Sequence, residues 1–332
     1  MFKQKIRTRT FFRRAGAIFM KIDIISPIYN EIEGIHEFLI ALEETLIRIR
    51  KQYSFNVILV DDGSSDGTFE LLKKRKYLFP TQLIKLSRNY GHQSALWTGI
   101  ENSRRDSFII TLDSDLQDDP KWINTICNRF VDSYEIVLMV RGSRKDGIFK
   151  KAFAQIYYFV LSRILKSDLQ RNMGDFFGLS PLAKHSLLSH QESVKYIRGL
   201  VSQLGFKKTI VEYDRKSRNA GKTHYTISKM FALALAGITG FSFQPLILAF
   251  YLSLSGGVFG LSVILYILYL KLFTDVNLTP GWAFATIVSV MMLVTILLTL
   301  SIVSLYIARI TQEIKKRPIS IVAQHIKYRN NE

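Results

Sequence analysis

The sequence has one cysteine and little proline. Its 332 residues include only Cys127 and seven prolines. One cysteine excludes an internal disulfide framework and a cysteine-based zinc cluster. The low proline content, together with 48% hydrophobic residues, excludes a wholly disordered or collagen-like chain. A chain of this length and composition can therefore form one large folded domain or two ordinary ones.

Charged residues are missing from two long stretches toward the C-terminus. Residues 230–270 and 276–308 contain no Asp, Glu, Lys or Arg. Because about 20 apolar residues cross the hydrocarbon layer of a bilayer, the second stretch predicts one membrane-spanning helix. The first stretch is too long for one span, and Pro245 divides it into a shorter interfacial helix and a span. Buried core helices are the alternative interpretation, although few soluble helices are uncharged all round.

Positive charge dominates the rest of the chain, with 45 Lys and Arg against 27 Asp and Glu and a net charge of +18. The positive-inside rule then predicts that the large amino-terminal part and both termini are cytoplasmic. A basic N-terminal arm suits anionic lipid, and no nucleic-acid-binding motif accompanies the charge, so we expect a bilayer and no nucleic acid as partner. The expected parts are a basic arm (1–20), a cytoplasmic domain (21–228), an interfacial helix (229–242), two transmembrane helices within 243–308 (about 246–270 and 282–306) and a basic cytoplasmic tail (309–332).

The cytoplasmic part reads as strands alternating with helices. Strands are expected at 21–26, 55–60, 82–86, 107–112 and 136–140, with helices at 33–51, in the stretch leading to Tyr77 and at 91–102. This alternation predicts an α/β domain with an open, mostly parallel sheet that has helices on both faces. In such sheets ligands bind at the carboxyl ends of the strands.

Acidic side chains follow two of these strands at that edge. Asp113, Asp115 and Gln117 come after the fourth strand at a spacing of two, and would share one face if the chain stays extended. The pair Asp61 and Asp62 ends the second strand. Carboxylate and amide oxygens suit a hard cation, so Mg²⁺ or Mn²⁺ is the expected cofactor. An exposed acidic loop is the simpler alternative.

Four segments at this edge resemble motifs of family 2 glycosyltransferases. They read Ser-Pro-Ile-Tyr-Asn-Glu at 26–31, Val-Asp-Asp-Gly-Ser-Ser-Asp-Gly-Thr at 60–68, Arg-Asn-Tyr-Gly-His at 88–92 and Leu-Asp-Ser-Asp-Leu-Gln-Asp-Asp-Pro at 112–120. Over about residues 20–325 the chain is similar to polyprenyl-phosphate glycosyltransferases of the bactoprenol type, and more distantly to dolichol-phosphate mannose synthase. The resemblance implies an A-type, Rossmann-like nucleotide-sugar domain and an inverting transfer.

The resemblance also implies roles for individual residues toward the donor. Those implied to surround the base and ribose are Pro27, Tyr29, Glu31 and Asp62. Asp113 would lie near the ribose and diphosphate, while Asp115 and Gln117 would hold the metal. Residues 218–225 resemble the loop that clamps the donor diphosphate. Its candidate cations are Arg218, Lys222 and His224, the last of which replaces the family's lysine.

A lipid phosphate acceptor changes what the site must do. A phosphate monoester is already anionic near neutral pH, so it needs positioning and positive charge more than a strong base. Arginine binds phosphate bidentately, and the candidates are Arg141, Arg144 and Arg215. Asp175 matches the aspartate proposed as the family's base, and we interpret it as an orienting or proton-holding group. The simpler alternatives are a solvated basic face and a turn-capping aspartate.

Two further features have open or structural interpretations. An apolar stripe at 149–160 either guides a polyprenyl chain in the headgroup layer or packs on the sheet. For Cys127 and His92 the sequence favours structural roles.

The sequence thus predicts a multi-pass enzyme of the cell (inner) membrane that moves a sugar from a UDP-sugar to polyprenyl (undecaprenyl) phosphate, giving polyprenyl-phosphate sugar and UDP. Glucose is the sugar implied by the resemblance, and a homo-oligomer is compatible with it. Two alternatives stay open. A processive polysaccharide synthase usually has a Gln-x-x-Arg-Trp motif and more spans, both missing here. A non-catalytic membrane scaffold would not need the intact Asp113-Ser114-Asp115 motif.

Overall fold

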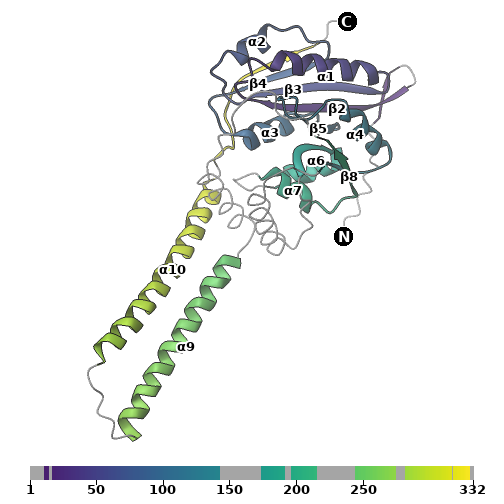
Figure 1. The fold of residues 1–332 in the computed structure, drawn as a ribbon. Helices are drawn as coiled ribbons and strands as arrows, with labels where there is room; N and C mark the ends of the chain where they lie inside the picture. The colour runs from purple at the N-terminus through teal and green to yellow at the C-terminus, as the bar shows by residue number, and fades with distance from the viewer. Residues whose placement is uncertain are drawn as a thin grey trace. The chain divides into compact units, whose positions relative to one another are not determined.

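The computed structural model describes residues 11–14, 17–142, 173–190, 196–214, 244–273, 281–315 and 317–329 (Figure 1). The chain divides into two compact units. The first comprises residues 1–154, 167–223 and 318–332, and the second comprises 155–166 and 224–317. The first unit contains the sheet, and the second contains two long helices.

The first unit is built on a mixed sheet with nine strands among the described residues. In chain order they are β1 (Phe11–Arg14), β2 (Ala17–Ile28), β3 (Tyr53–Asp61), β4 (Thr81–Leu86), β5 (Phe108–Thr111), β6 (Ile136–Arg141), β7 (Met173–Leu179), β8 (Lys208–Tyr213) and β9 (Val322–Tyr328). Their spatial order is β8-β6-β7-β5-β2-β3-β4-β9, and β1 pairs with β2. The central run β5-β2-β3-β4 is parallel throughout, as predicted. Strand β7 is antiparallel to both of its neighbours.

Helices cover both faces of this sheet. They are α1 (Ile35–Ile49), α2 (Thr68–Lys74), α3 (His92–Glu101), α4 (Trp122–Val131), α6 (Pro181–Leu188) and α7 (Ile197–Gln203). Apolar residues of α1, α2 and α4 join Ile24 of β2 in one buried cluster that includes Cys127. The next residue of β2, Ile25, points to the other face. There α3 packs so closely that a Cβ on Gly99 would lie 2.3 Å from the Ile25 Cγ2.

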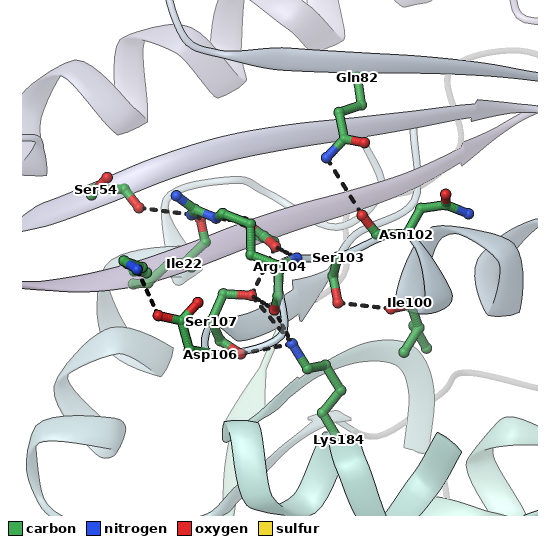
Figure 2. A network of polar contacts seen from close by, with 12 residues as sticks. Ile22, Ser54, Gln82, Ile100, Asn102, Ser103, Arg104, Asp106, Ser107 and Lys184 are labelled. Atoms are coloured by element: carbon green, nitrogen blue, oxygen red, sulfur yellow. Dashed lines mark hydrogen bonds and ion pairs between the residues drawn. The ribbon is translucent and has the colours of Figure 1, made fainter. Parts of the chain in front are cut away.

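A buried polar network stabilises the amino-terminal edge of the parallel strands (Figure 2). The Arg104 Nε donates to the fully buried Asp23 carboxylate at 2.6 Å, and its Nη2 donates to the carbonyl oxygens of Ile22 and Ser54. From α6, the Lys184 Nζ donates to the carbonyl oxygens of Arg104 and Ser107. Burial lowers the pKa of Lys184 to about 8. The network joins β2, β3, α6 and the turn before β5.

The strands and helices predicted within residues 21–228 correspond to β2 to β6 and α1 to α3. The two ends of this unit differ from the expectation. Within the basic arm, residues 11–14 form β1, and β2 begins at Ala17. Within the expected tail, α10 extends to Ile314 and residues 322–328 form β9 on the edge of β4. Strand β9 has mostly exposed, mixed polar and apolar residues, a pattern that does not identify a strand by hydropathy.

The second unit contains α9 (Gln244–Phe273) and α10 (Trp282–Ile314). Their segments Ala249–Leu270 and Val288–Ala308 have mean hydropathies of 1.8 and 2.5, and are long and apolar enough to cross a membrane. Only 6% of the first segment and 0% of the second is buried. The Ser253 and Thr299 hydroxyls are 3.1 Å apart, so the helices contact one another through small polar residues. Exposed apolar helices of this length indicate membrane association. The expected interfacial helix, 229–242, and the apolar stripe, 149–160, lie outside the described residues.

Candidate active site

A cleft of about 250 Å³ opens at the carboxyl ends of β2, β3 and β5. It is therefore at the edge where an α/β sheet binds its ligands. Its lining comes from the end of β2 and the residues after it, the residue that follows β3, the loop between β4 and α3 with the start of α3, and the chain after β5. The residues are Pro27, Ile28, Tyr29, Glu31, Asp62, Asn89, Gly91, His92, Ala95, Asp113, Ser114 and Asp115.

Hydrogen bonds from backbone N–H groups to side-chain oxygens hold the chain after β2 against the chain after β3. Asn30 adopts a left-handed conformation with φ of 51°. Its N–H donates to the Ser64 Oγ at 2.9 Å, and its side-chain oxygen accepts the Ser65 N–H at 2.9 Å. The Glu31 N–H donates to the Thr68 Oγ1 at 3.1 Å. Two motifs that are distant in the sequence are thereby joined along one wall of the cleft, with Tyr29 about half exposed.

Asp62 organises the loop of residues 88–91 that forms the next wall. Its carboxylate accepts the Tyr90 N–H at 2.8 Å and the Gly91 N–H at 2.9 Å. Burial raises the pKa of Asp62, and these two bonds oppose the increase. Gly63 lies so close to the loop that a Cβ there would be 2.5 Å from the Arg88 carbonyl carbon, and its φ of +72° also favours glycine. The loop is therefore held tightly against the end of β3.

The chain after β5 turns as it leaves the sheet. Strand β5 ends at Thr111, Leu116 has a left-handed φ of 56°, and the Gln117 N–H donates to the Asp115 Oδ1 at 3.1 Å. This differs from the expected extended chain with three side chains on one face. Asp113 and Asp115 both line the cleft, whereas Gln117 is not among the described residues that line it.

Asp175, on β7, has partners at both carboxylate oxygens. The Arg198 Nε donates to Oδ1 at 2.7 Å and its Nη2 donates to Oδ2. The Gln93 Nε2 also donates to Oδ1, at 3.1 Å, and the His92 Nε2 lies 3.2 Å from Oδ2. Burial alone would raise the pKa of Asp175, but the hydrogen bonds from Arg198 and His92 hold it well below its usual range. This carboxylate therefore stays ionised.

His92 connects Asp175 to the carboxylate of the fourth-strand motif. Its Nε2 is 3.5 Å from the Asp113 Oδ1 as well as 3.2 Å from Asp175. Burial lowers the pKa of His92, but the hydrogen bond to Asp175 and the two negative charges raise it above the ordinary value. The pKa of Asp113 is raised to about 6, first by burial and then by the nearby carboxylates, while His92 lowers it. His92 thus lies in the cleft between two carboxylates that favour its protonated form. The sequence had favoured a structural role for this residue.

Arg141, at the end of β6, lies beside the start of β7. A Cβ on Gly174 would be 2.9 Å from the Arg141 Nη2, so the guanidinium packs directly on the backbone next to Asp175. Its Nε is buried and has no hydrogen-bond partner among the described residues. The neighbouring Tyr213 hydroxyl donates to the Asp118 carboxylate.

Comparison with known proteins identifies the family. The family described as glycosyl transferase family 2 matches residues 23–188. An uncharacterized glycosyltransferase, YkcC, from Bacillus subtilis (strain 168) is 36% identical over 305 residues, covering 91% of this chain and 93% of that protein. This chain belongs to glycosyl transferase family 2.

Two further relatives have more specific names. A prophage bactoprenol glucosyl transferase homolog of Escherichia coli (strain K12) is 30% identical and covers 91% of this chain and 98% of its own length. A bactoprenol glucosyl transferase of Shigella phage SfII is also 30% identical, with 91% and 97% covered. The domain is the α/β nucleotide-sugar transferase fold expected from the sequence, and the chain is a glycosyltransferase.

The family 2 cleft brings together most of the donor residues expected from the sequence. Pro27, Tyr29, Glu31, Asp62, Asp113 and Asp115 all line it. Five expected cations lie outside the described residues: Arg144, Arg215, Arg218, Lys222 and His224. Arg198 and Gln93 were not expected. No local pattern marks Arg198, because its role depends on a partner 23 residues earlier.

The side chains of the cleft supply only part of the ligands that a divalent cation needs. Among the described residues, no three His, Cys, Asp or Glu side chains form a group that could hold a metal. Asp113 and Asp115 nevertheless bring two carboxylates to one cleft, and their repulsion contributes to the raised pKa of Asp113. Mg²⁺ and Mn²⁺ typically bind through one or two carboxylates and complete their shell with substrate phosphates and water. The residues present fit a cation that binds together with a nucleotide.

Proposed function

We propose that this family 2 transferase moves a sugar from a UDP-sugar to polyprenyl phosphate at the cytoplasmic face of the membrane, with inversion. The sugar is glucose by similarity to the bactoprenol glucosyl transferases. The observation that carries the proposal is that one chain combines two features. It has a carboxylate-lined cleft at the sheet edge and two exposed apolar helices of membrane-spanning length.

We propose that the UDP-sugar donor binds to residues that line the cleft. Pro27, Tyr29, Glu31 and Asp62 would surround the uridine, with Asp113 near the ribose and diphosphate. Asp115 would hold Mg²⁺ or Mn²⁺, with Gln117 as the second proposed ligand, two residues away in the same turn. Bound there, the cation would supply Lewis-acid stabilisation of the UDP leaving group.

The acceptor side needs positive charge and does not need a strong base. A phosphate monoester with a second pKa near 6 is mostly dianionic at cytoplasmic pH. Its oxygen would attack the anomeric carbon while the bond from that carbon to UDP breaks, so no proton has to be removed. Asp175 would act as a positioning residue that holds Arg198 and His92 beside the cleft. Arg141, whose guanidinium packs on the backbone next to Asp175, stays a prediction for binding the acceptor phosphate, as do Arg144 and Arg215.

The strand pairing supports a two-span arrangement. Strand β9 follows α10 in the chain and pairs with β4, which precedes α9. If both helices cross the bilayer, the chain must therefore enter and leave it on the same side. The basic surplus of the flanking segments favours the cytoplasmic side.

The test is a transferase assay on the purified full chain in nanodiscs. Undecaprenyl phosphate is incubated with a panel of UDP-sugars, with and without Mn²⁺, and lipid products are identified by mass. We expect one sugar phosphate product that requires the metal. Asp115→Asn should lower turnover by about a hundredfold or more, because it removes a charged metal ligand. Asp119→Asn is the matched control, because Asp119 belongs to the same acidic segment and is not part of the cleft lining.

Three results would contradict the proposal. A chain that forms no lipid-linked product from any UDP-sugar would not be this transferase. A polymeric product would favour the processive synthase. Unchanged function in the Asp115→Asn variant would favour a scaffold.

A further inference from the structure

Near the C-terminus, residues 320–328 belong to the first unit and contact residues on either side of one wall of the cleft. We call residues 320–328 the tail strand, because Ser320 and Ile321 lead directly into β9. Figure 1 shows this yellow segment beside β4, and the two strands pair antiparallel from Leu86↔Val322 to Thr81↔Tyr328. Only five residues separate Ser320 from Ile314, the last residue of α10.

The first residues of the tail strand hold both flanks of the loop 88–91. On one flank, the Ser87 N–H donates to the Ile321 carbonyl oxygen at 2.9 Å. On the other flank, the Ser320 hydroxyl is 2.6 Å from the hydroxyl of Thr98, a residue of α3 that is almost completely buried. Ser87 immediately precedes the loop, and α3 immediately follows it.

The same loop forms one wall of the cleft. Asn89 and Gly91 line it, and the backbone N–H groups of Tyr90 and Gly91 bind the Asp62 carboxylate. Within the loop region, the Ser94 hydroxyl donates to the Tyr90 carbonyl oxygen at 3.0 Å. The loop is thus fixed by Asp62 at Tyr90 and Gly91, and the tail strand contacts the residue before the loop and the helix after it.

Fixing both ends of a short loop reduces the number of conformations open to it. A loop that already has its binding conformation loses less entropy when a ligand binds, so the ligand binds more tightly. If the tail strand were released, the Ser87 N–H and the Thr98 hydroxyl would both lose a partner. The loop would then be held by the bonds of its Tyr90 and Gly91 amides to Asp62, without support from the tail strand.

We propose that the tail strand is a positioning element for the donor nucleotide, acting through Ser87 and Thr98 on the loop 88–91. Ser320 is the residue whose side chain makes this contact. The identity of the ligand rests on the proposed function, whereas the positioning of the loop does not. Because the tail strand follows α10 so closely, donor binding in this enzyme depends on the chain segment that leaves the membrane helices.

The test compares two variants of the full chain in nanodiscs that each remove one hydroxyl from the tail strand. Ser320→Ala removes the contact with Thr98. Tyr328→Phe is the matched control, because its hydroxyl donates to the Lys73 carbonyl oxygen at the far end of the strand. Hydrogen exchange of the Tyr90 and Gly91 amides is measured without nucleotide, and UDP binding is measured by calorimetry with Mn²⁺.

We expect Ser320→Ala to speed exchange of the two amides and to weaken UDP binding, each by about three- to tenfold, the range of one lost hydrogen bond. The donor KM should rise similarly while kcat is retained. Tyr328→Phe should change both quantities less than about twofold, although its melting temperature falls as much as that of Ser320→Ala. Adding Thr98→Val to Ser320→Ala should give less than the sum of the two single effects on exchange, because both variants remove the Ser320–Thr98 contact. Thr98→Val also removes the hydroxyl that donates to the Ser94 carbonyl oxygen.

Equal exchange of the loop amides in Ser320→Ala and the unmodified chain would overturn the positioning role, as would equal effects of the two tail-strand variants. Additive effects of Ser320→Ala and Thr98→Val would also contradict it. If the unmodified chain does not bind UDP, the proposed function fails. The exchange comparison still decides whether the tail strand positions the loop.

Discussion

The Arg198 guanidinium binds both oxygens of the Asp175 carboxylate. One partner is on β7 and the other on α7, so the pair joins the antiparallel part of the sheet to the helix beside the cleft. The carboxylate is almost fully buried, and its pKa is held well below the usual range. A group that remains ionised throughout the physiological range is a poor proton acceptor. In this site the carboxylate fixes Arg198 and His92 in place.

Asp175→Asn should therefore lower kcat, while the acid limb of the pH profile of kcat persists between pH 5 and 8. The amide keeps the shape of the side chain but weakens its hold on Arg198, so we expect a loss of about ten- to a hundredfold. Gln93→Ala removes a neutral donor from the same carboxylate and should cost less than about tenfold. Disappearance of an acid limb in the pH profile of Asp175→Asn would instead identify Asp175 as a base.

Asp113→Asn should stabilise the metal-free chain. Because the folded-state pKa of Asp113 is raised to about 6, ionising it in the folded chain costs up to about 3 kcal/mol above pH 6. The variant should melt several degrees higher at pH 7.5. This gain should shrink as the pH falls from 6 to 4, because the folded carboxyl then becomes protonated. Thermal unfolding at pH 7.5 and at pH 4 measures the gain. A gain in melting temperature that does not depend on pH would contradict the charge-based explanation.

His92→Gln should move the pH dependence of UDP binding with Mn²⁺ to higher pH. In the folded chain the His92 charge lowers the pKa of Asp113. Without that charge Asp113 should stay protonated to a higher pH, and a protonated carboxyl cannot help to bind a cation. Calorimetry without the acceptor isolates this effect from the titration of the lipid phosphate. His190→Gln is the control, since the His190 side chain bonds to the Ser186 carbonyl oxygen of α6. An unchanged midpoint in His92→Gln would contradict the prediction.

Arg104→Met should destabilise the first unit without affecting the cleft. The substitution removes the guanidinium that faces the fully buried Asp23 carboxylate, and breaking a buried ion pair costs about 3–5 kcal/mol. The double variant with Asp23→Asn should recover part of this loss, because the unpaired charge is also removed. Denaturant unfolding measures the stability, and UDP binding should be unchanged because the network is at the opposite edge of the sheet. A double variant as unstable as Arg104→Met would contradict this explanation.

The central strands and the functional residues that follow them could be predicted, because both are recognised from short stretches of consecutive residues. Strands β2 to β6 contain short apolar runs, and the residues after them carry the family motifs. Strand β7 was not predicted, because its Met-Gly-Asp-Phe-Phe-Gly-Leu sequence contains two glycines and an aspartate. It forms a strand because it pairs with β5 and β6 on either side. The turn after β5 was also missed, since Leu116 adopts a left-handed conformation that sequence does not favour for leucine.

Composition, charge-free runs and local motifs were sufficient for the family, the α/β class, the sheet edge that carries the chemistry and the two apolar helices. These features depend on periodicity and on residues that follow one another in the chain. Folding brought His92 between Asp113 and Asp175, placed Arg198 on Asp175, and brought Ser320 to Thr98 across 222 residues. Such contacts depend on where distant segments pack in three dimensions, and a hydroxyl or a guanidinium carries no local sign of its eventual partner.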